Sequence, residues 1–186
     1  MNPQELLDFW FEGQPDRFRE IWFQRDDAFD AVIRDRFEGT TAAALDGRLD
    51  HWAATPEGLL ALVIALDQLP RNLHRGTPAA FGGDARALHW ARHGVETGMD
   101  AALTPVQRNF LYLPFMHAED LTEQERCVRL FEAMTGLPQV ERPIDSARRH
   151  HEVIRRFGRF PHRNTALRRA STPEEEAYVA TPGTAF

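Results

Sequence analysis

The stretch from Gly58 to Leu69 constrains the fold more than any other part of the sequence. Leucine, isoleucine, valine and alanine occupy nearly every position around the predicted helix axis. Thr55 can act as the N-cap of this helix, with Pro56 in its first turn and Glu57 at its positive end. A helix that is nonpolar all round must be covered on all sides. We therefore expect it to be the central, most buried element.

The remaining patterns indicate an all-α fold. No segment alternates polar and nonpolar residues as a strand does, and the breaks between periodic segments fit roughly eight or nine helices. The chain has 186 residues and a mass of 21.3 kDa, which suits one domain. We predict antiparallel helix pairs in a single compact domain over residues 1–180, followed by a flexible tail at 181–186.

Three further helices are predicted from local signals. One helix should run from Ala79 to about Val95. A second should carry His117, Asp120 and Gln124 on one face, because these residues are spaced three and four apart. A third should run from Ser146 to Phe157, after a linker that extends to about Asp145.

The charge pattern excludes several classes of function. All 22 basic residues are arginine, so chemistry that needs a lysine is excluded. The net charge is −6, yet residues 141–170 hold nine arginines against three acids, a local balance of +6. We expect no general affinity for nucleic acid, whereas a local anion site at this basic end is compatible with the pattern.

Compartment and membrane contact follow from two further features. Cys127 is the single cysteine, and the N-terminus lacks the basic and nonpolar segments of a secretory signal. The longest nonpolar run is about half the length that spans a bilayer. These features predict a cytoplasmic protein with no membrane helix.

The densest polar stretch runs from Arg156 to Asn164, where arginine, histidine and asparagine alternate with aromatic rings. Gly158 and Pro161 prevent a plain helix there, which is typical of a corner that forms a site. Polar groups also appear where the central helix ends, at Asp67 and Arg71, which are four residues apart and can pair along one face of the helix. The candidate binding residues are therefore Asp67, Arg71, Asn72, Arg156, Arg159, His162, Arg163 and Asn164.

A second polar cluster surrounds His117. A histidine beside carboxylates can serve as a general acid or base, although such a run is also typical of a solvated acidic helix start. The candidate catalytic residues are His117, Glu119, Asp120 and His151. No phosphate loop or zinc spacing occurs, so the cofactor stays unknown and no metal site is assigned.

Several motifs together resemble the bacterial domain-of-unknown-function 924 family. They are Phe9-Trp10-Phe11, Trp22-Phe23, Leu66-Asp67-Gln68-Leu69-Pro70-Arg71-Asn72, the run from Tyr112 to Asp120, Arg156 to Asn164, and Ser171 to Glu175. The resemblance implies an all-helical fold similar to tetratricopeptide repeats and no established activity. Ala118 departs from the motif, where a serine is more usual, and this makes a nucleophile at that position less expected.

Two functions remain open on these grounds. The first is a pocket that binds a small anion bearing a phosphate or carboxylate, with acid/base catalysis as an extension. The second is a module for binding a protein or peptide, in which the arginine, histidine and aspartate side chains form a purely structural network.

Overall fold

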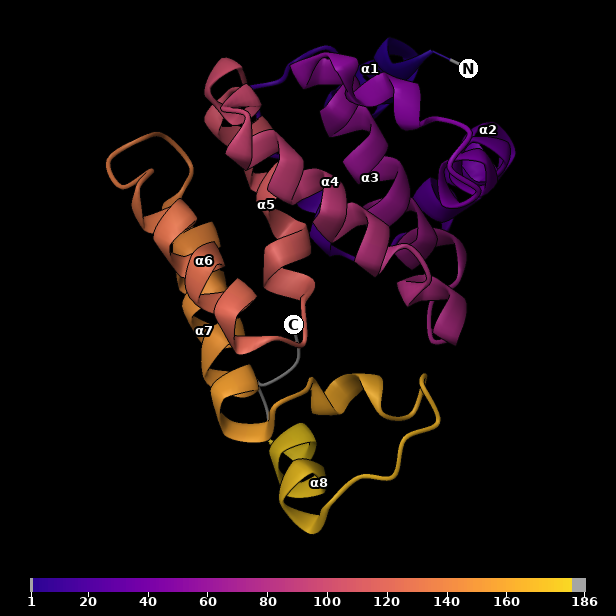
Figure 1. Cartoon of the computed structure of the whole chain (residues 1–186). Helices are drawn as coiled ribbons and strands as arrows, with labels where there is room; N and C mark the ends of the chain where they lie inside the picture. Colours follow the sequence, from indigo (N-terminus) through magenta and orange to yellow (C-terminus); the bar gives the residue numbers. More distant parts are fainter. Residues whose placement is uncertain (1, 182–186) are drawn as a thin grey trace.

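The computed structural model describes residues 2–181, and this part of the chain is helical throughout, with no strand (Figure 1). The prediction of an all-α fold in one compact domain is confirmed. The predicted tail lies outside the described residues apart from Thr181. The α-helices are α1 (Pro3–Phe11), α2 (Asp27–Leu45), α3 (Pro56–Leu73), α4 (Asp84–Glu96), α5 (Pro105–His117), α6 (Leu121–Glu132), α7 (Glu141–Phe157) and α8 (Pro173–Ala180). Short 3-10 helices are η1 (Glu20–Phe23), η2 (Asp50–Ala54), η3 (Pro78–Phe81), η4 (Met99–Ala102) and η5 (Pro161–Arg163).

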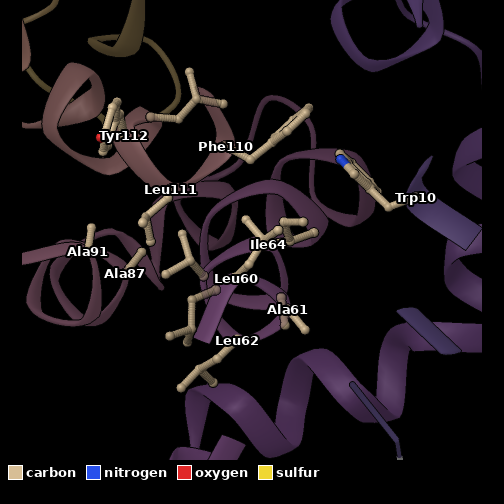
Figure 2. Packing of buried hydrophobic residues seen from close by; sticks show 14 of the residues in the cluster. Trp10, Leu60, Ala61, Leu62, Ile64, Ala87, Ala91, Phe110, Leu111 and Tyr112 are labelled. Atoms are coloured by element: carbon tan, nitrogen blue, oxygen red, sulfur yellow. The ribbon is translucent and has the colours of Figure 1, made fainter. Parts of the chain in front are cut away.

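Helix α3 is the central element, as its nonpolar sequence requires. It contacts α1, α2, α4 and α5, and its residues from Leu59 to Leu66 are fully buried. Figure 2 shows its side chains pointing to different sides, toward Ala87 and Ala91 of α4 and toward Phe110 of α5. The end of α3 therefore lies inside the protein, and any polar group placed there is removed from water.

Helices α5, α6 and α7 form a second layer beside this core. Helix α6 runs back along α5, and α7 returns along α6, so that α5 and α7 run in the same direction (Figure 1). Beyond Gly158, which ends α7 with a φ of 69°, the chain turns through η5 to α8. This arrangement brings the ends of α3, α5 and α7 to the same region as η5.

The prediction of one helix from Ala79 to Val95 is wrong. The chain forms η3 first and begins α4 only at Asp84. The reason is the packing of Gly83, where an added Cβ would overlap the carbonyl oxygen of Leu66 in α3. This close approach of two backbones separates the two helices and brings Asp84 next to the end of α3.

The prediction that His117, Asp120 and Gln124 share one helix is also wrong. Helix α5 ends at His117, Ala118 is extended, and Asp120 is the N-cap of α6, where its side chain accepts a hydrogen bond of 3.1 Å from the amide of Glu123. The predicted linker up to Asp145 is wrong as well, since α7 begins at Glu141. The break after His117 lets its ring turn toward α3.

Candidate functional site

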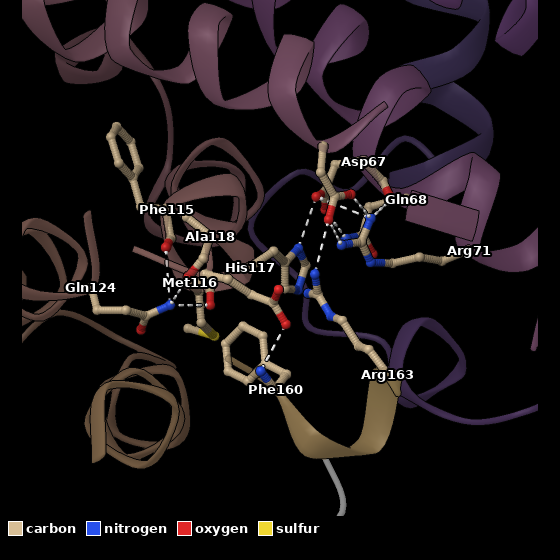
Figure 3. A network of polar contacts seen from close by, with 12 residues as sticks. Asp67, Gln68, Arg71, Phe115, Met116, His117, Ala118, Gln124, Phe160 and Arg163 are labelled. Carbon is tan, nitrogen blue, oxygen red and sulfur yellow. Dashed lines mark hydrogen bonds and ion pairs between the residues drawn. The ribbon is translucent and has the colours of Figure 1, made fainter. Parts of the chain in front are cut away.

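The carboxylate of Asp67 is the centre of the polar site. It lies in the last part of α3 and is fully buried. His117 Nδ1 lies 2.8 Å from Asp67 Oδ1, the guanidinium of Arg71 lies 3.2 Å from the same oxygen, and the side-chain amide of Gln68 donates to Oδ2 (Figure 3). Each carboxylate oxygen thus has a donor, as a buried charge requires.

The protonation states of this pair follow from its surroundings. Burial alone would raise the pKa of Asp67, but the charge of Arg71 and the contacts of His117 and Gln68 lower it far below its usual range. Burial, assisted by Arg71, lowers the pKa of His117 although Asp67 opposes that change. At neutral pH the carboxylate is therefore ionised and the imidazole neutral. His117 Nδ1 then donates its hydrogen to Asp67, and Nε2 carries the lone pair.

A second carboxylate extends the network to η5. The guanidinium of Arg71 lies 2.9 Å from Asp84 Oδ1, and Arg163 donates to Asp84 Oδ2 at 3.1 Å. The guanidinium of Arg163 also lies 4.7 Å from the ring centres of both Phe81 and Phe160. We call the five residues Asp67, Arg71, Asp84, His117 and Arg163 the Asp67 cluster. With His117 neutral its two aspartates balance its two arginines.

A pocket of about 290 Å³ lies between α5 and α7, next to this cluster. We call it the α5–α7 pocket. His117 belongs to both, since it contacts Asp67 and also lines the pocket. The lining residues are Phe18, Phe23, Asn109, Leu113, Met116, His117, Arg142, Pro143, Ser146, Arg149 and His150.

The charged residues of the α5–α7 pocket are all basic. Among its described lining residues there are two arginines and two histidines and no carboxylate. Arg142 lies 3.4 Å from Glu20, outside the pocket. Arg149 forms no ion pair with another side chain within residues 2–181. The pocket therefore offers positive charge that no carboxylate among residues 2–181 neutralises.

His150 is the second imidazole of the pocket. Its ring centre lies 6.5 Å from that of His117, and its Nδ1 is 2.8 Å from the carbonyl oxygen of Ser146. Because a carbonyl only accepts hydrogen bonds, His150 Nδ1 carries the hydrogen. Burial lowers the pKa of His150 to about 3, although the bond to Ser146 acts in the opposite direction. Both pocket histidines are thus neutral at pH 7.

The structure brings together some of the residues predicted for the site. Asp67, Arg71, His117 and Arg163 form the Asp67 cluster with Asp84. The predicted pairing of Asp67 with Arg71, four residues apart on one helix, is confirmed at 3.2 Å. The confirmed pair is thus one that lies within a single helical turn, where sequence spacing alone places the two side chains on the same face.

A neighbouring network contains three more predicted residues. Glu119 accepts a hydrogen bond of 2.7 Å from the amide of Phe160 and pairs with Arg169. Arg159 pairs with Glu175 at 2.6 Å, and the side chain of Asn164 donates to Ser171 at 3.0 Å. These contacts tie the segment after α7 to the connection between α5 and α6 and to α8.

The other predicted residues lie elsewhere. Asn72 donates to Asp30 at 2.8 Å, and Arg156 pairs with Glu174 at 2.7 Å on the surface. His151 lies 3.7 Å from Glu152. His162 of η5 is the exception, because it lies near the Asp67 cluster: burial and the charges of Arg163 and His117 lower the pKa of His162 to about 4. Asp120 is the α6 cap described above. A functional role for these five residues stays a prediction.

Sequence reasoning missed Asn109, Ser146, Arg149 and His150 in the pocket and Asp84 in the cluster. The residues of α7 that line the pocket recur at spacings of three and four, from Arg142 through Ser146 to Arg149 and His150. Such a spacing places them on one face of the helix. This periodicity was the available signal, but it identifies a face without identifying what lies opposite.

Two kinds of feature are absent from the described part of the chain. Within residues 2–181, no group of three or more histidine, cysteine, aspartate or glutamate side chains is arranged to hold a metal ion. In the same part of the chain, every helix is too short or too polar to cross a membrane.

The buried histidines predict a loss of stability at mildly acidic pH. In the unfolded chain each histidine takes up a proton near pH 6.5, whereas burial lowers the pKa values of His117 and His150 in the folded chain. The unfolded state therefore binds more protons below pH 6.5, and stability falls with pH. We expect His150 to contribute a loss of about 2 kcal/mol between pH 7.5 and 5, and His117 to add to it in the same direction, measured by urea unfolding.

This pH range separates the histidines from the carboxylates, which titrate in the unfolded chain near pH 4. The variant His150→Gln should reduce the loss of stability between pH 7.5 and 5 by the contribution of one histidine. His89→Gln, at an exposed position of α4, is the matched control and should leave it unchanged. An identical pH dependence in all three proteins would contradict the prediction.

Glu119→Ala is expected to loosen the segment that follows α7. The change removes the acceptor of the Phe160 amide and the carboxylate partner of Arg169, and a hydrogen bond to a charged group contributes about 1.5–3 kcal/mol. Amide hydrogen exchange in residues 158–172 should become about tenfold faster or more, while α3 keeps its protection. Glu125→Ala, at an exposed position of α6, should change neither region.

Comparisons with known proteins agree with this architecture. The family model of the bacterial proteins of unknown function called DUF924 matches residues 6–183. The solved structure of a protein of unknown function from Agrobacterium tumefaciens is 39% identical and superimposes with a TM-score of 0.86, over 96% of each chain. No curated protein sequence matches. The family match spans the Asp67 cluster and the α5–α7 pocket.

Proposed function

The chain belongs to the DUF924 family of bacterial proteins of unknown function, and we propose from its site that the α5–α7 pocket binds a small anionic ligand. The observation that carries this proposal is the lining of the pocket, which has arginine and neutral histidine but no carboxylate among its described residues. We further propose that His117 accepts a proton from a hydroxyl group or water molecule held beside the anion.

Charge supports the first part of the proposal. Arg149 is the basic residue of the pocket that has no carboxylate partner among residues 2–181, and its guanidinium can donate two parallel hydrogen bonds to a carboxylate or phosphate. Arg71, Arg159 and Arg163 are already paired with aspartate or glutamate. The anion site is therefore assigned to Arg149 rather than to the arginines of the Asp67 cluster.

The protonation state of His117 supports the second part. Its Nε2 lone pair can take the proton of an O–H group, whose bonding electrons stay on the oxygen. The resulting imidazolium would then donate from Nδ1 to the ionised carboxylate of Asp67, which stabilises the charge. Such proton transfer by a positioned side chain contributes typically 10² to 10⁴ in rate. Asp67 acts here as a positioning residue, because it contacts His117 and lies outside the pocket lining.

The second candidate is a protein- or peptide-binding module with a structural polar network. The pairing of most predicted arginines with carboxylates favours the structural role of that network. Five large nonpolar side chains are exposed among the described residues. They are Phe23, Val32, Leu121, Leu137 and Val179. The predicted likeness to tetratricopeptide repeats and the cytoplasmic location remain predictions.

Binding of simple anions tests the proposal. Thermal shift and titration calorimetry with phosphate, phenyl phosphate, acetate and octanoate should identify at least one anion that binds. Arg149→Ala should weaken that binding about tenfold or more, the worth of one charge-assisted contact. Arg148→Ala is the matched control, since Arg148 is the preceding residue on α7 and pairs with Glu132 outside the pocket. Equal affinities in the two variants would contradict the proposal.

A further inference from the structure

The α5–α7 pocket has two different ends. Its lining residues follow the chain along two parallel helices, from Asn109 to His117 on α5 and from Arg142 to His150 on α7 (Figure 1). Each interval is eight residues, or about 12 Å of helix. The pocket is therefore elongated. Asn109 and Arg142 lie at one end, and His117 and His150 lie at the other.

The end of the pocket near Asn109 and Arg142 contains two aromatic rings. Phe18 and Phe23 stack with ring centres 5.7 Å apart and an angle of 7° between the rings. Their place at this end is fixed by Arg142, whose guanidinium lies 5.5 Å from the ring of Phe18, and by Phe110, whose ring lies 6.3 Å from Phe23. Phe23 is 46% exposed, which is unusual for a phenylalanine with aromatic neighbours on both sides.

The opposite end is polar and basic. His117 and His150 lie there, and Arg149 precedes His150 on α7. Leu113 and Met116 form the wall of α5 between the two ends. A ligand that fills the pocket therefore meets the nonpolar side chains of α5 and the two phenylalanine rings. At the aromatic end Arg142 is already paired with Glu20, so the arginine without a carboxylate partner among residues 2–181 is Arg149 at the opposite end.

We infer that the ligand is an amphipathic carboxylate. Its carboxylate binds Arg149 beside the two histidines, and its nonpolar body extends over Leu113 and Met116 to the stacked rings of Phe18 and Phe23. This inference rests on the proposed function, because it names the class of anion that the same pocket takes. The volume of about 290 Å³ is at the lower limit of small-molecule pockets, which suits a medium chain or a single ring.

A series of carboxylates tests the inference by titration calorimetry with acetate, butanoate and octanoate, and with 1-octanol as the uncharged control. Affinity should increase about fourfold for each CH₂ group that becomes buried. Octanoate should bind much more tightly than butanoate, and at least tenfold more tightly than 1-octanol.

Two variants assign the two ends of the pocket. Phe23→Ser should weaken octanoate about tenfold and leave butanoate unchanged, because only the longer chain reaches the aromatic end. Val32→Ser is the matched control, at an exposed nonpolar position of α2 outside the pocket. Arg149→Ala should weaken both carboxylates by the same factor, and unchanged thermal melts would establish that the variants fold.

The outcomes separate this inference from the proposed function. If acetate and butanoate bind as tightly as octanoate and depend on Arg149, the amphipathic class is wrong and the anion site stands. If 1-octanol binds as tightly as octanoate, or Arg149→Ala changes nothing, the anion site itself is overturned. If phosphate or phenyl phosphate binds through Arg149 while no carboxylate binds, the inference alone is wrong.

Discussion

Asp67→Ala is expected to lower the free energy of unfolding by about 3–5 kcal/mol. Asp67 is fully buried and accepts contacts from His117, Gln68 and Arg71. Without it, the Asp67 cluster changes from balanced charge to one uncompensated positive charge, away from most of the solvent. Removing one partner of a buried ion pair is costly because the other partner keeps its desolvation penalty. Urea unfolding at pH 7, followed by circular dichroism, measures the effect.

Asp46→Ala provides the matched control for this large effect. Asp46 follows α2 and pairs with Arg48 at 3.1 Å, but its side chain is 64% exposed. Solvent screens such a pair, so its loss should change stability by less than about 1 kcal/mol. If Asp67→Ala lowered the free energy of unfolding no more than Asp46→Ala, the Asp67 cluster would not stabilise the fold. The proposal that Asp67 orients His117 would then also be contradicted.

Gly83→Ala is the second substitution expected to have a large effect. The backbone of Gly83 is in the right-handed helical region, with φ of −94° and ψ of −8°, so alanine fits the local conformation. The added Cβ, however, would overlap the carbonyl oxygen of Leu66, which belongs to the buried helix α3. We expect a loss of about 2–3 kcal/mol, typical of overpacking against atoms that cannot move.

Gly82→Ala separates this clash from any general effect of replacing glycine. Gly82 is the preceding residue, has a φ of −63°, and its added Cβ would lie 3.4 Å from the carbonyl oxygen of Ala79, which is ordinary contact. The free energy of unfolding of Gly82→Ala should stay within about 0.5 kcal/mol of that of the unsubstituted protein or increase slightly, because alanine restricts the unfolded chain. Equal costs at both positions would mean that the contact with Leu66 is not the cause.

The Gly83 prediction also concerns the site. Asp84 follows Gly83 directly and joins Arg71 to Arg163. If α4 moves away from α3, this carboxylate moves with it. Since the Asp67 cluster positions His117, and His117 lines the pocket in which Arg149 is proposed to bind the anion, we expect Gly83→Ala to weaken anion binding as well as to lower stability, whereas Gly82→Ala should leave both unchanged. The same titration used for Arg149→Ala measures this.

The sequence determined by itself those features that depend on neighbouring residues. The predicted helix start at Thr55 is confirmed, and its side chain accepts a hydrogen bond from the amide three residues later. Thr104 and Thr172 cap α5 and α8 in the same way. The predicted ion pair between Asp67 and Arg71 spans one helical turn. The nonpolar run of α3 predicted its central position, because water must be excluded from every side of it. These features are local, and so a local pattern is enough to predict them.

The tertiary structure alone decided where the chemistry lies. No sequence pattern near Gly83 indicates that Leu66 lies against it. The helix that periodicity predicted is divided only because α4 packs on α3. The break in the helix at Ala118 lets the ring of His117 turn toward Asp67, which lies fifty positions earlier in the chain. The α5–α7 pocket exists because two parallel helices face each other across an aromatic corner from residues 18–23. Such contacts join residues far apart in the chain, and their energies depend on burial, which a sequence pattern does not contain.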